Sequence, residues 1–352
     1  MVSTYGCDAP SGLAGTAGVP TEQAITRRPR TVSFFPMSIS PRLGRVLALA
    51  LLLFPSRVGA QEQRFEFAQL HMGMEVRLIV YAADSTVAIH AAAAAFRCIG
   101  KLEDIMSDYR DESEVRRLGR SHGQWNPVSR ELLLVLREAL TIAERSGGAF
   151  DPTVGPLIAL WREARRTGEL PPADSLARAQ ARVGWSHVSI DTVQGRVRLG
   201  LPEMTLDLGG IAKGFILDAA KAELEAHGVT RALLIAGGDI VAGAAPPGMS
   251  GWTVEAPGAG AGFRRLAHQL HDQALATSGD GEQFVAVNGR RYSHVIDPRT
   301  GIGLTNGRRA YVMAPSGARA DALATALTVM AGQDRAALLA YYPEVVAEIH
   351  ER

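Results

Sequence analysis

The stretch Leu206-Asp207-Leu208-Gly209-Gly210-Ile211-Ala212-Lys213-Gly214 is where the chain passes from one backbone pattern to another. Alternating apolar and polar residues over Met204–Leu208 predict a strand, and a helical pattern follows the two glycines over Phe215–Ala226. A strand, a tight turn and a helix N-terminus present free N–H groups and a positive dipole end to an anion. Asp207 adds a carboxylate that suits a metal ion, and Lys213 adds a cation. The alternative is a plain turn whose glycines serve packing.

The composition is that of a folded protein. The 352 residues are 47% hydrophobic and carry a formal net charge of +1. This length predicts one large domain or two of medium size. A nearly neutral chain with ample apolar residues has neither the charge of a typical nucleic-acid-binding protein nor the composition of a disordered one. We therefore expect a stable core and no nucleic-acid partner.

The first 60 residues are predicted to lie outside the fold. Residues 1–36 have no hydrophobic period, and Met37 is the expected true start. A basic region, the apolar run Val46–Phe54 and the small residues Val58-Gly59-Ala60 then form the pattern of a signal peptide. The apolar run is too short to span a bilayer. We expect export to the periplasm and cleavage after Ala60, which leaves residues 61–352 as the functional domain.

The cysteines give a secondary expectation. No cysteine lies at the predicted cleavage site, so a lipid anchor is not expected. Cleavage would remove Cys7 and leave Cys98, so no disulfide within the mature chain is expected. Cys98 lies in an alanine-rich helical pattern, which predicts a small buried residue.

Helices and hairpins are predicted in mixed order along the chain, which favours an α+β fold over a regular βαβ succession. Asp84 or Ser85 is expected to cap one helix and Ser129 another. Asn288-Gly289 is the strongest hairpin signal. The expected strands lie at 64–81 (interrupted at 71–74), 232–236, 252–255, 266–276, 284–287, 291–296 and 311–314, and a hairpin lies at 185–199. The expected helices lie at 84–106 (with a break at Gly100 left open), 131–145, 157–166, 174–183, 215–227, 320–330 and after 335.

Asp321 and Thr325 form a second candidate site. At positions i and i+4 of a predicted helix they share one face. A carboxylate and a hydroxyl are oxygen donors that suit Mg²⁺, which takes few protein ligands together with phosphate and water. The alternative is that Asp321 is an acid in the first helical turn and Thr325 a packing residue.

Three further residues stand in loops or at a strand end. His294 ends a predicted strand beside Asp297-Pro298, where it is either structural or a general base. Tyr109 is the only aromatic residue of a polar loop, and it either caps the surface or stacks on a ligand. Asp151 precedes Pro152 in a rigid loop.

These segments together resemble a known family. They occur in this order: Met72-Gly73, Tyr109, Gly148-Ala149-Phe150-Asp151-Pro152-Thr153-Val154-Gly155-Pro156-Leu157, Asp207-Leu208-Gly209-Gly210-Ile211-Ala212-Lys213-Gly214, Gly237-Gly238-Asp239, Thr277-Ser278-Gly279, Ser293-His294-Val295-Ile296-Asp297-Pro298 and Ala320-Asp321-Ala322-Leu323-Ala324-Thr325-Ala326. The set resembles the ApbE family, the FAD:protein FMN transferases, over essentially the whole mature chain. The resemblance implies an ApbE-like, T-fold-related α+β architecture with antiparallel sheets and packed helices.

The resemblance also implies roles for residues. FAD would be bound with help from Met72, Tyr109, Ala149, Phe150, Asp151, Asp207, Lys213, His294 and Ile296. Mg²⁺ would be held by Asp321, Thr325 and a backbone oxygen in the glycine turn, that of Gly210. His294 is the expected base, with Asp321 as the competing candidate. Met74 stands where the family often has threonine or serine, so no polar contact is expected there.

The implied reaction moves FMN from FAD to a threonine or serine hydroxyl of an acceptor protein and releases AMP. The acceptor motif implied by the family is Asp-x-x-(Ser/Thr)-Gly-Ala-(Ser/Thr), and any membrane association would be indirect, through the acceptor. Two alternatives stay open. The same residues would serve a Mg²⁺-dependent pyrophosphatase that cleaves FAD to FMN and AMP, and a flavin-binding protein without turnover would need no base.

Overall fold

A computed structural model describes residues 61–121, 123–256, 266–279 and 284–351. The predicted N-terminal extension and signal peptide lie outside the described residues. Within the described part, no helix combines the length and the apolar character needed to cross a membrane.

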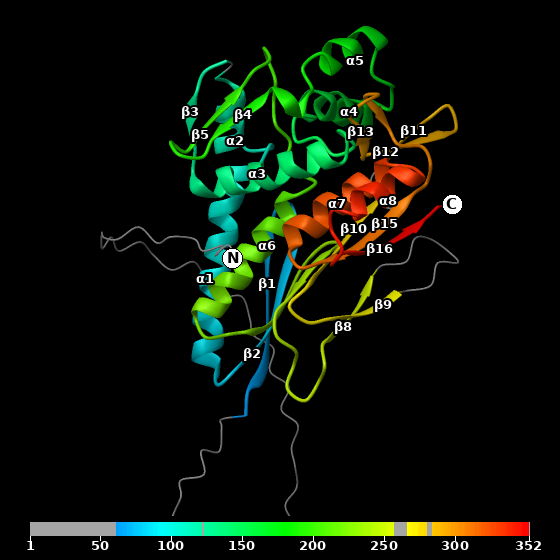
Figure 1. Cartoon of the computed structure of the whole chain (residues 1–352). Coiled ribbons are helices and arrows are strands. Elements are labelled where there is room, and N and C mark those ends of the chain that lie inside the picture. The colour runs from blue at the N-terminus through cyan, green and yellow to red at the C-terminus, as the bar shows by residue number, and fades with distance from the viewer. Residues whose placement is uncertain (1–60, 122, 257–265, 280–283, 352) are drawn as a thin grey trace, which may run out of the picture. The chain divides into compact units, whose positions relative to one another are not determined.

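The centre of the fold is an antiparallel sheet. Among the described residues its seven strands lie in the order β1-β2-β6-β7-β10-β15-β16 (Figure 1). Each neighbouring pair is antiparallel. The strands are β1 (Gln63–His71), β2 (Met74–Ala82), β6 (Arg231–Ala236), β7 (Asp239–Ala242), β10 (Ala274–Gly279), β15 (Arg309–Ala314) and β16 (Val346–His350).

Side chains of the sheet alternate between two cores, because successive residues of a strand point to opposite faces. In β2, Val76, Leu78 and Val80 join the large core under the helices. Ile79 instead joins a smaller core on the other face, together with Trp252. That smaller core lies under the hairpin formed by β8 (Trp252–Ala256) and β9 (Leu266–Leu270).

Three helices pack on the face of the large core: α1 (Ser85–Met106), α6 (Ala212–Ala226) and α7 (Gly317–Val329) (Figure 1). The Asp84 carboxylate caps α1 by accepting hydrogen bonds from two backbone N–H groups of its first turn. Cys98 is buried in α1, as the alanine-rich pattern predicts. The expected absence of a disulfide concerns a chain cut after Ala60, and the other cysteine, Cys7, lies outside the described residues.

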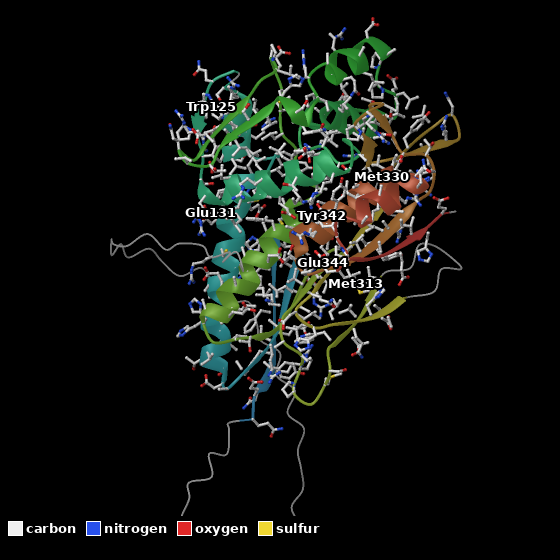
Figure 2. The ribbon with its side chains drawn as sticks, viewed as in Figure 1. Trp125, Glu131, Met313, Met330, Tyr342 and Glu344 are labelled. Atoms are coloured by element: carbon white, nitrogen blue, oxygen red, sulfur yellow. The ribbon has the colours of Figure 1, made fainter. Side chains whose placement is uncertain are left out.

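The first turn of α7 is held by a charged side chain. Arg319 donates hydrogen bonds at 3.1 Å to Glu138 of α3 (Arg130–Arg145) and at 2.9 Å to Glu344. Its guanidinium also lies 5.3 Å from the ring centroid of Tyr342. Figure 2 labels Tyr342 and Glu344 beside this end of α7. These contacts join α7 to α3 and to the segment before β16.

The remaining elements lie outside the seven-stranded sheet and the three helices that cover it. They are α2 (Glu114–Gly119), β3 (Asn126–Pro127), α4 (Gly155–Thr167), α5 (Ala173–Gln180), a short 3-10 helix η1 (Trp185–His187), β4 (Val188–Asp191), β5 (Arg196–Leu199), β11 (Phe284–Val287), β12 (Arg290–Ser293), β13 (Ile296–Asp297), β14 (Ile302–Gly303) and α8 (Gln333–Leu339). A third apolar cluster joins Leu157 and Trp161 of α4 to Val285 and Ile296.

The α+β prediction is confirmed, and so are the helix cap at Ser129 and the hairpin at Asn288-Gly289. Asn288 and Gly289 both have positive φ, at 50° and 74°, as the tight hairpin turn requires. The break left open at Gly100 does not occur, since α1 continues to Met106.

Four local predictions are wrong. Residues 271–273 divide the strand expected at 266–276 into β9 and β10. Met204–Leu208 alternates in burial like a strand but joins no sheet within the described residues, and the Asp207 N–H instead donates to the Pro152 carbonyl at 2.8 Å. His294 lies between β12 and β13, not in a strand. α7 begins at Gly317, so Asp321 falls in its second turn.

Candidate active site

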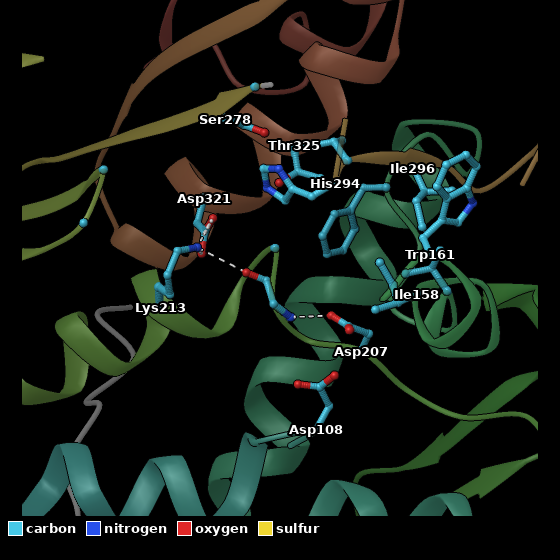
Figure 3. A pocket seen from close by; sticks show the side chains of 18 of the residues that line it. Asp108, Ile158, Trp161, Asp207, Lys213, Ser278, His294, Ile296, Asp321 and Thr325 are labelled. Carbon is cyan, nitrogen blue, oxygen red and sulfur yellow. Dashed lines mark hydrogen bonds and ion pairs between the residues drawn. The ribbon is translucent and has the colours of Figure 1, made fainter. Parts of the chain in front are cut away.

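The predicted site residues gather around one cavity of about 490 Å³. Figure 3 shows Lys213 and Asp321 at one side of it and Trp161 and Ile158 at the other, with His294 between them in this view. The predicted residues that line it are Tyr109, Ala149, Phe150, Asp151, Asp207, Gly210, Lys213, His294, Ile296, Asp321 and Thr325. Segments more than 200 residues apart in the sequence therefore meet at one place, as the motifs predict.

Met72 is the exception. It occupies the turn between β1 and β2 with a φ of 52°, and it does not line the cavity. Met74, two residues later, does line it. Met74 is a thioether side chain and contributes no strong polar group. The implied contact of Met72 with FAD stays a prediction.

Lys213 is the charged centre of the site. Its Nζ donates hydrogen bonds to both carboxylate oxygens of Asp321, at 3.1 Å each, and to the Gly209 carbonyl at 3.2 Å. It also forms an ion pair with Asp239 Oδ2 at 2.9 Å. Burial opposes the charged ammonium, but the two carboxylates outweigh burial and raise the pKa of Lys213. Lys213 is therefore a permanent cation at the cavity wall.

Asp239 is a functional candidate to which the sequence assigns no role. It begins β7, is 2% exposed and lies beside the Lys213 ammonium. Burial and the nearby Asp321 carboxylate raise the pKa of Asp239 to about 7, although Lys213 acts in the opposite direction. The Gly237-Gly238-Asp239 motif marked this turn, but the pairing with Lys213 depends on the packing of α6 against β7.

A close approach of two helices places Lys213 next to Asp321. A Cβ added at Gly214 would lie 2.0 Å from the Gly317 carbonyl oxygen, so only glycine permits this crossing of α6 and α7. Next to the crossing, the Asp218 carboxylate accepts hydrogen bonds from Gly317 N at 2.7 Å and Ala318 N at 3.0 Å. Gly214 therefore serves helix packing from within α6, outside the glycine turn.

Asp207 belongs to a second charged group. Arg162 of α4 donates a hydrogen bond to Asp207 at 3.2 Å, forms an ion pair with Asp108, and lies 4.1 Å from the Tyr109 ring centroid. Burial and the Asp108 carboxylate raise the pKa of Asp207 to about 7, against the opposing effect of Arg162. Sequence reasoning missed Asp108 and Arg162. Tyr109 stacks on Arg162 and is 75% exposed, so its outer face is open to a ligand.

Asp151 organises its own loop. Its Oδ1 accepts hydrogen bonds from the Thr153 N–H at 2.8 Å and the Thr153 hydroxyl at 2.6 Å, and its Oδ2 accepts one from Trp185 N at 3.0 Å. Burial raises the pKa of Asp151, although these three donors favour the carboxylate. Asp151 therefore fixes the wall that carries Ala149 and Phe150.

The opposite wall is apolar. Ile158, Trp161 and Ile296 line it (Figure 3), and the Trp161 indole N–H donates to the Gly301 carbonyl at 2.8 Å. A flat aromatic ligand can pack on such a surface, while the charged groups across the cavity suit an anionic portion of the same ligand.

The oxygen atoms at the charged end are of the type that binds a hard divalent cation such as Mg²⁺. No group of three or more His, Cys, Asp or Glu side chains suited to a metal occurs in the described ranges. Mg²⁺ does not require one, because it takes one or two carboxylates and completes its shell with phosphate oxygens and water. Asp321 and Thr325 line the cavity from one face of α7. Thr325 Oγ1 lies close to Gly210, since a Cβ there would be 3.0 Å away.

A family model described as the ApbE family matches residues 72–349. A curated relative from Treponema pallidum, named FAD:protein FMN transferase, is 33% identical over 310 residues, which are 82% of this chain and 84% of the relative. A relative of the same name from Vibrio cholerae is 34% identical over 247 residues, which are 68% of this chain and 72% of the relative.

Solved structures agree with the family model. The flavin transferase ApbE from Vibrio cholerae superposes with a TM-score of 0.73 and 27% identity, over 82% of this chain and 97% of that one. The apo form of the Pseudomonas stutzeri flavinyl transferase ApbE superposes with a TM-score of 0.72 and 26% sequence identity. The match covers 82% of this chain and 90% of that one.

Proposed function

This chain belongs to the ApbE family, and from that premise we propose that it transfers the FMN portion of FAD to a hydroxyl group of an acceptor protein. The observation that carries the proposal is the cavity itself. It sets an apolar wall with Ile158 and Trp161 opposite a charged end with Lys213 and Asp321 (Figure 3). FAD has the matching parts, an aromatic ring system and a pyrophosphate.

In the proposed complex the isoalloxazine or adenine ring packs on the apolar wall. The pyrophosphate lies near the glycine turn at Gly209 and Gly210, where Lys213 supplies positive charge. Asp207 and Arg162 position polar atoms of the ligand at the side that Tyr109 borders. The residues bind and orient FAD so that the phosphorus of its FMN half faces the acceptor hydroxyl.

The proposed transfer forms one bond and breaks one. The acceptor hydroxyl oxygen attacks the FMN phosphorus, and the bond from that phosphorus to the bridging oxygen breaks. The bridging oxygen leaves as part of AMP, and the product is a phosphoester between FMN and the threonine or serine. His294, which lines the cavity, is the proposed acceptor of the hydroxyl proton.

The transfer is proposed to depend on Mg²⁺. Asp321, Thr325 and the Gly210 carbonyl would hold the ion, which would withdraw negative charge from the phosphoryl oxygens and the leaving AMP. Asp321 remains the competing candidate for the base, but its carboxylate already accepts two hydrogen bonds from Lys213. This arrangement favours His294.

The acceptor is proposed to carry a motif of the form Asp-x-x-(Ser/Thr)-Gly-Ala-(Ser/Thr) and to lie outside the cytoplasm. The export signal predicted in residues 1–60 supports that location. Any membrane association would come through the acceptor.

The test is to mix the protein with FAD, Mg²⁺ and an acceptor protein that carries the motif, and to follow acceptor mass and AMP together. We expect the acceptor to gain the mass of FMN less one water, with one AMP per modified acceptor. AMP released without modified acceptor would indicate a pyrophosphatase. Bound FAD with neither product would indicate a flavin-binding protein.

A further inference from the structure

The Lys213 ammonium has more oxygen neighbours than it has N–H groups to donate. An ammonium has three N–H donors. The Nζ of Lys213 lies within 3.2 Å of four oxygens, two from Asp321, one from Asp239 and one from Gly209. Its hydrogen bonds go to Asp321 and to the Gly209 carbonyl, whereas the pair with Asp239 at 2.9 Å lacks hydrogen-bond alignment. The ammonium therefore cannot donate to all four oxygens at once. A small movement of the ammonium toward Asp239 would improve the alignment of that ion pair.

Asp239 is fixed in place. It is the first residue of β7, where it is paired in the ladder with Ala236, and Gly237 turns the chain with a φ of 57°. Lys213 is the one ion-pair partner of Asp239 among the described residues. The Lys213 side chain is long and 27% exposed, whereas the Asp239 side chain is 3% exposed. Lys213 can therefore move while Asp239 stays.

In the structure Lys213 donates hydrogen bonds to both carboxylate oxygens of Asp321, and Asp321 is the residue proposed to bind Mg²⁺. We infer that Lys213 is an exchangeable cation and that Asp239 is the positioning residue that receives it. When a divalent ion takes Asp321, the ammonium shifts to Asp239 and the Gly209 carbonyl. This inference rests on the metal site of the proposed function and deepens it.

The charges support the exchange. Lys213, Asp239 and Asp321, when all are ionised, have a formal sum of −1, which attracts a cation. A divalent ion changes the sum to +1, which suits an incoming pyrophosphate. Without Asp239, the ammonium would have Asp321 as its only carboxylate partner in this cluster, and it would compete directly with the metal.

The test measures metal affinity on the full chain in the absence of FAD. The probe is Mn²⁺, titrated by electron paramagnetic resonance of the free ion, because Mn²⁺ shares the oxygen preference of Mg²⁺. Asp239→Asn is expected to weaken Mn²⁺ binding by about 10- to 100-fold, the usual range for a residue that orients a metal ligand. Lys213→Met is expected to bind Mn²⁺ at least as tightly as the unchanged protein.

The double variant separates positioning from simple charge. If Asp239 acts through Lys213, Asp239→Asn weakens binding much less in a Lys213→Met background. An equal loss in both backgrounds would show that the Asp239 carboxylate attracts the metal directly and would overturn the inference. Glu131→Gln is the matched control, since it removes a carboxylate that pairs with Lys101 at 2.7 Å and does not line the cavity. We expect less than a three-fold change for it.

A second readout is the melting temperature with and without Mn²⁺. Lys213→Met leaves two buried carboxylates without their cation, so its melting temperature should fall without Mn²⁺ and rise more on Mn²⁺ addition than that of the unchanged protein. Equal rises in all variants would contradict the exchange. Absence of Mn²⁺ binding to the unchanged protein would overturn both the metal site and the inference. Normal Mn²⁺ behaviour without FMN transfer would contradict the proposed function alone.

Discussion

His294 and Asp321 have different tasks in the proposed reaction, and single substitutions should separate them. His294→Ala is expected to keep FAD bound but to slow FMN transfer by about 10²- to 10⁴-fold, the usual effect of removing a positioned base. Single-turnover rates together with FAD titrations would measure the two effects independently. A variant that loses FAD affinity but keeps its single-turnover rate would show that His294 binds the substrate and is not the base.

Substitution of Asp151 is expected to lower the stability of the fold, because Asp151 organises its own loop. Asp151→Ala removes the carboxylate that accepts three hydrogen bonds. The Thr153 N–H, the Thr153 hydroxyl and the Trp185 N–H then lose this acceptor. We expect a loss of about 1–3 kcal/mol in the free energy of unfolding, measured by urea denaturation. Asp151→Asn keeps one oxygen acceptor and should lose less. Unchanged stability in Asp151→Ala, with weaker FAD binding, would indicate a direct ligand contact instead.

Single site residues were predictable where the chain itself marks them. Asp321 and Thr325 share a helical face, and the glycine turn stands beside Lys213 in the sequence. Asp108, Arg162 and Asp239 were not predictable as partners. Their contacts come from α4 meeting the Asp207 segment and from α6 packing on β7, and such long-range packing leaves no local pattern.

At the level of elements, the crossing of α6 and α7 sets the geometry of the site. Gly214→Ala would place a Cβ against the Gly317 backbone, which cannot move without separating the helices. We expect a destabilisation of about 1–3 kcal/mol, together with a loss of FMN transfer because Lys213 and Asp321 separate. Urea denaturation and the transfer assay would measure the two effects.

Gly100→Ala in α1 is the matched control for that substitution. Its added Cβ would meet only His71, at 3.8 Å, which is ordinary contact. Since alanine favours a helix over glycine by up to about 1 kcal/mol, we expect equal or greater stability and normal transfer. If Gly214→Ala behaves like Gly100→Ala, the close helix crossing does not control the site.

Elements with a local signal were predictable, and those defined by distant partners were not. Side-chain caps at Asp84 and Ser129 and the Asn288-Gly289 turn act within a few residues. The segment 204–208 has the alternation of a strand, yet its backbone partner is Pro152 in a loop. The alternation of apolar and polar residues therefore predicted which side chains are buried, but it did not predict whether the segment joins a sheet.

For the whole molecule, buried carboxylates make stability depend on pH. Burial raises the pKa of Asp218 from 3.8 to about 6. Between these values the unfolded chain has lost a proton that the folded chain retains, so the free energy of unfolding falls as pH rises from about 4 to 6. Asp218→Asn should remove this part of the decline, on the order of 3 kcal/mol. Urea denaturation at a series of pH values would measure it.

Asp191 offers a control of opposite sign. Its carboxylate accepts hydrogen bonds in an exposed hairpin turn, chiefly from the Gln194 N–H, and these lower its pKa. The stability it contributes is present above its ordinary pKa and is lost as pH falls. Asp191→Asn should therefore leave the decline above pH 4 intact. An unchanged slope in Asp218→Asn would contradict the assignment to Asp218.

Export is a further prediction at this scale. Expression in a bacterium with a periplasm, followed by N-terminal sequencing of the periplasmic protein, should find Gln61 as the first residue. Retention of residues 37–60 in a cytoplasmic protein would contradict the signal-peptide interpretation.

The most direct measurement of the central claim is the intact mass of an acceptor protein after incubation with FAD and Mg²⁺. We expect an adduct of FMN on a threonine or serine with the unchanged protein and with Asp334→Ala, which alters an exposed acid of α8. The adduct should disappear with Asp321→Ala and when EDTA replaces Mg²⁺. Full modification by Asp321→Ala, or AMP release without any adduct, would contradict the account of this cavity as a site of FMN transfer.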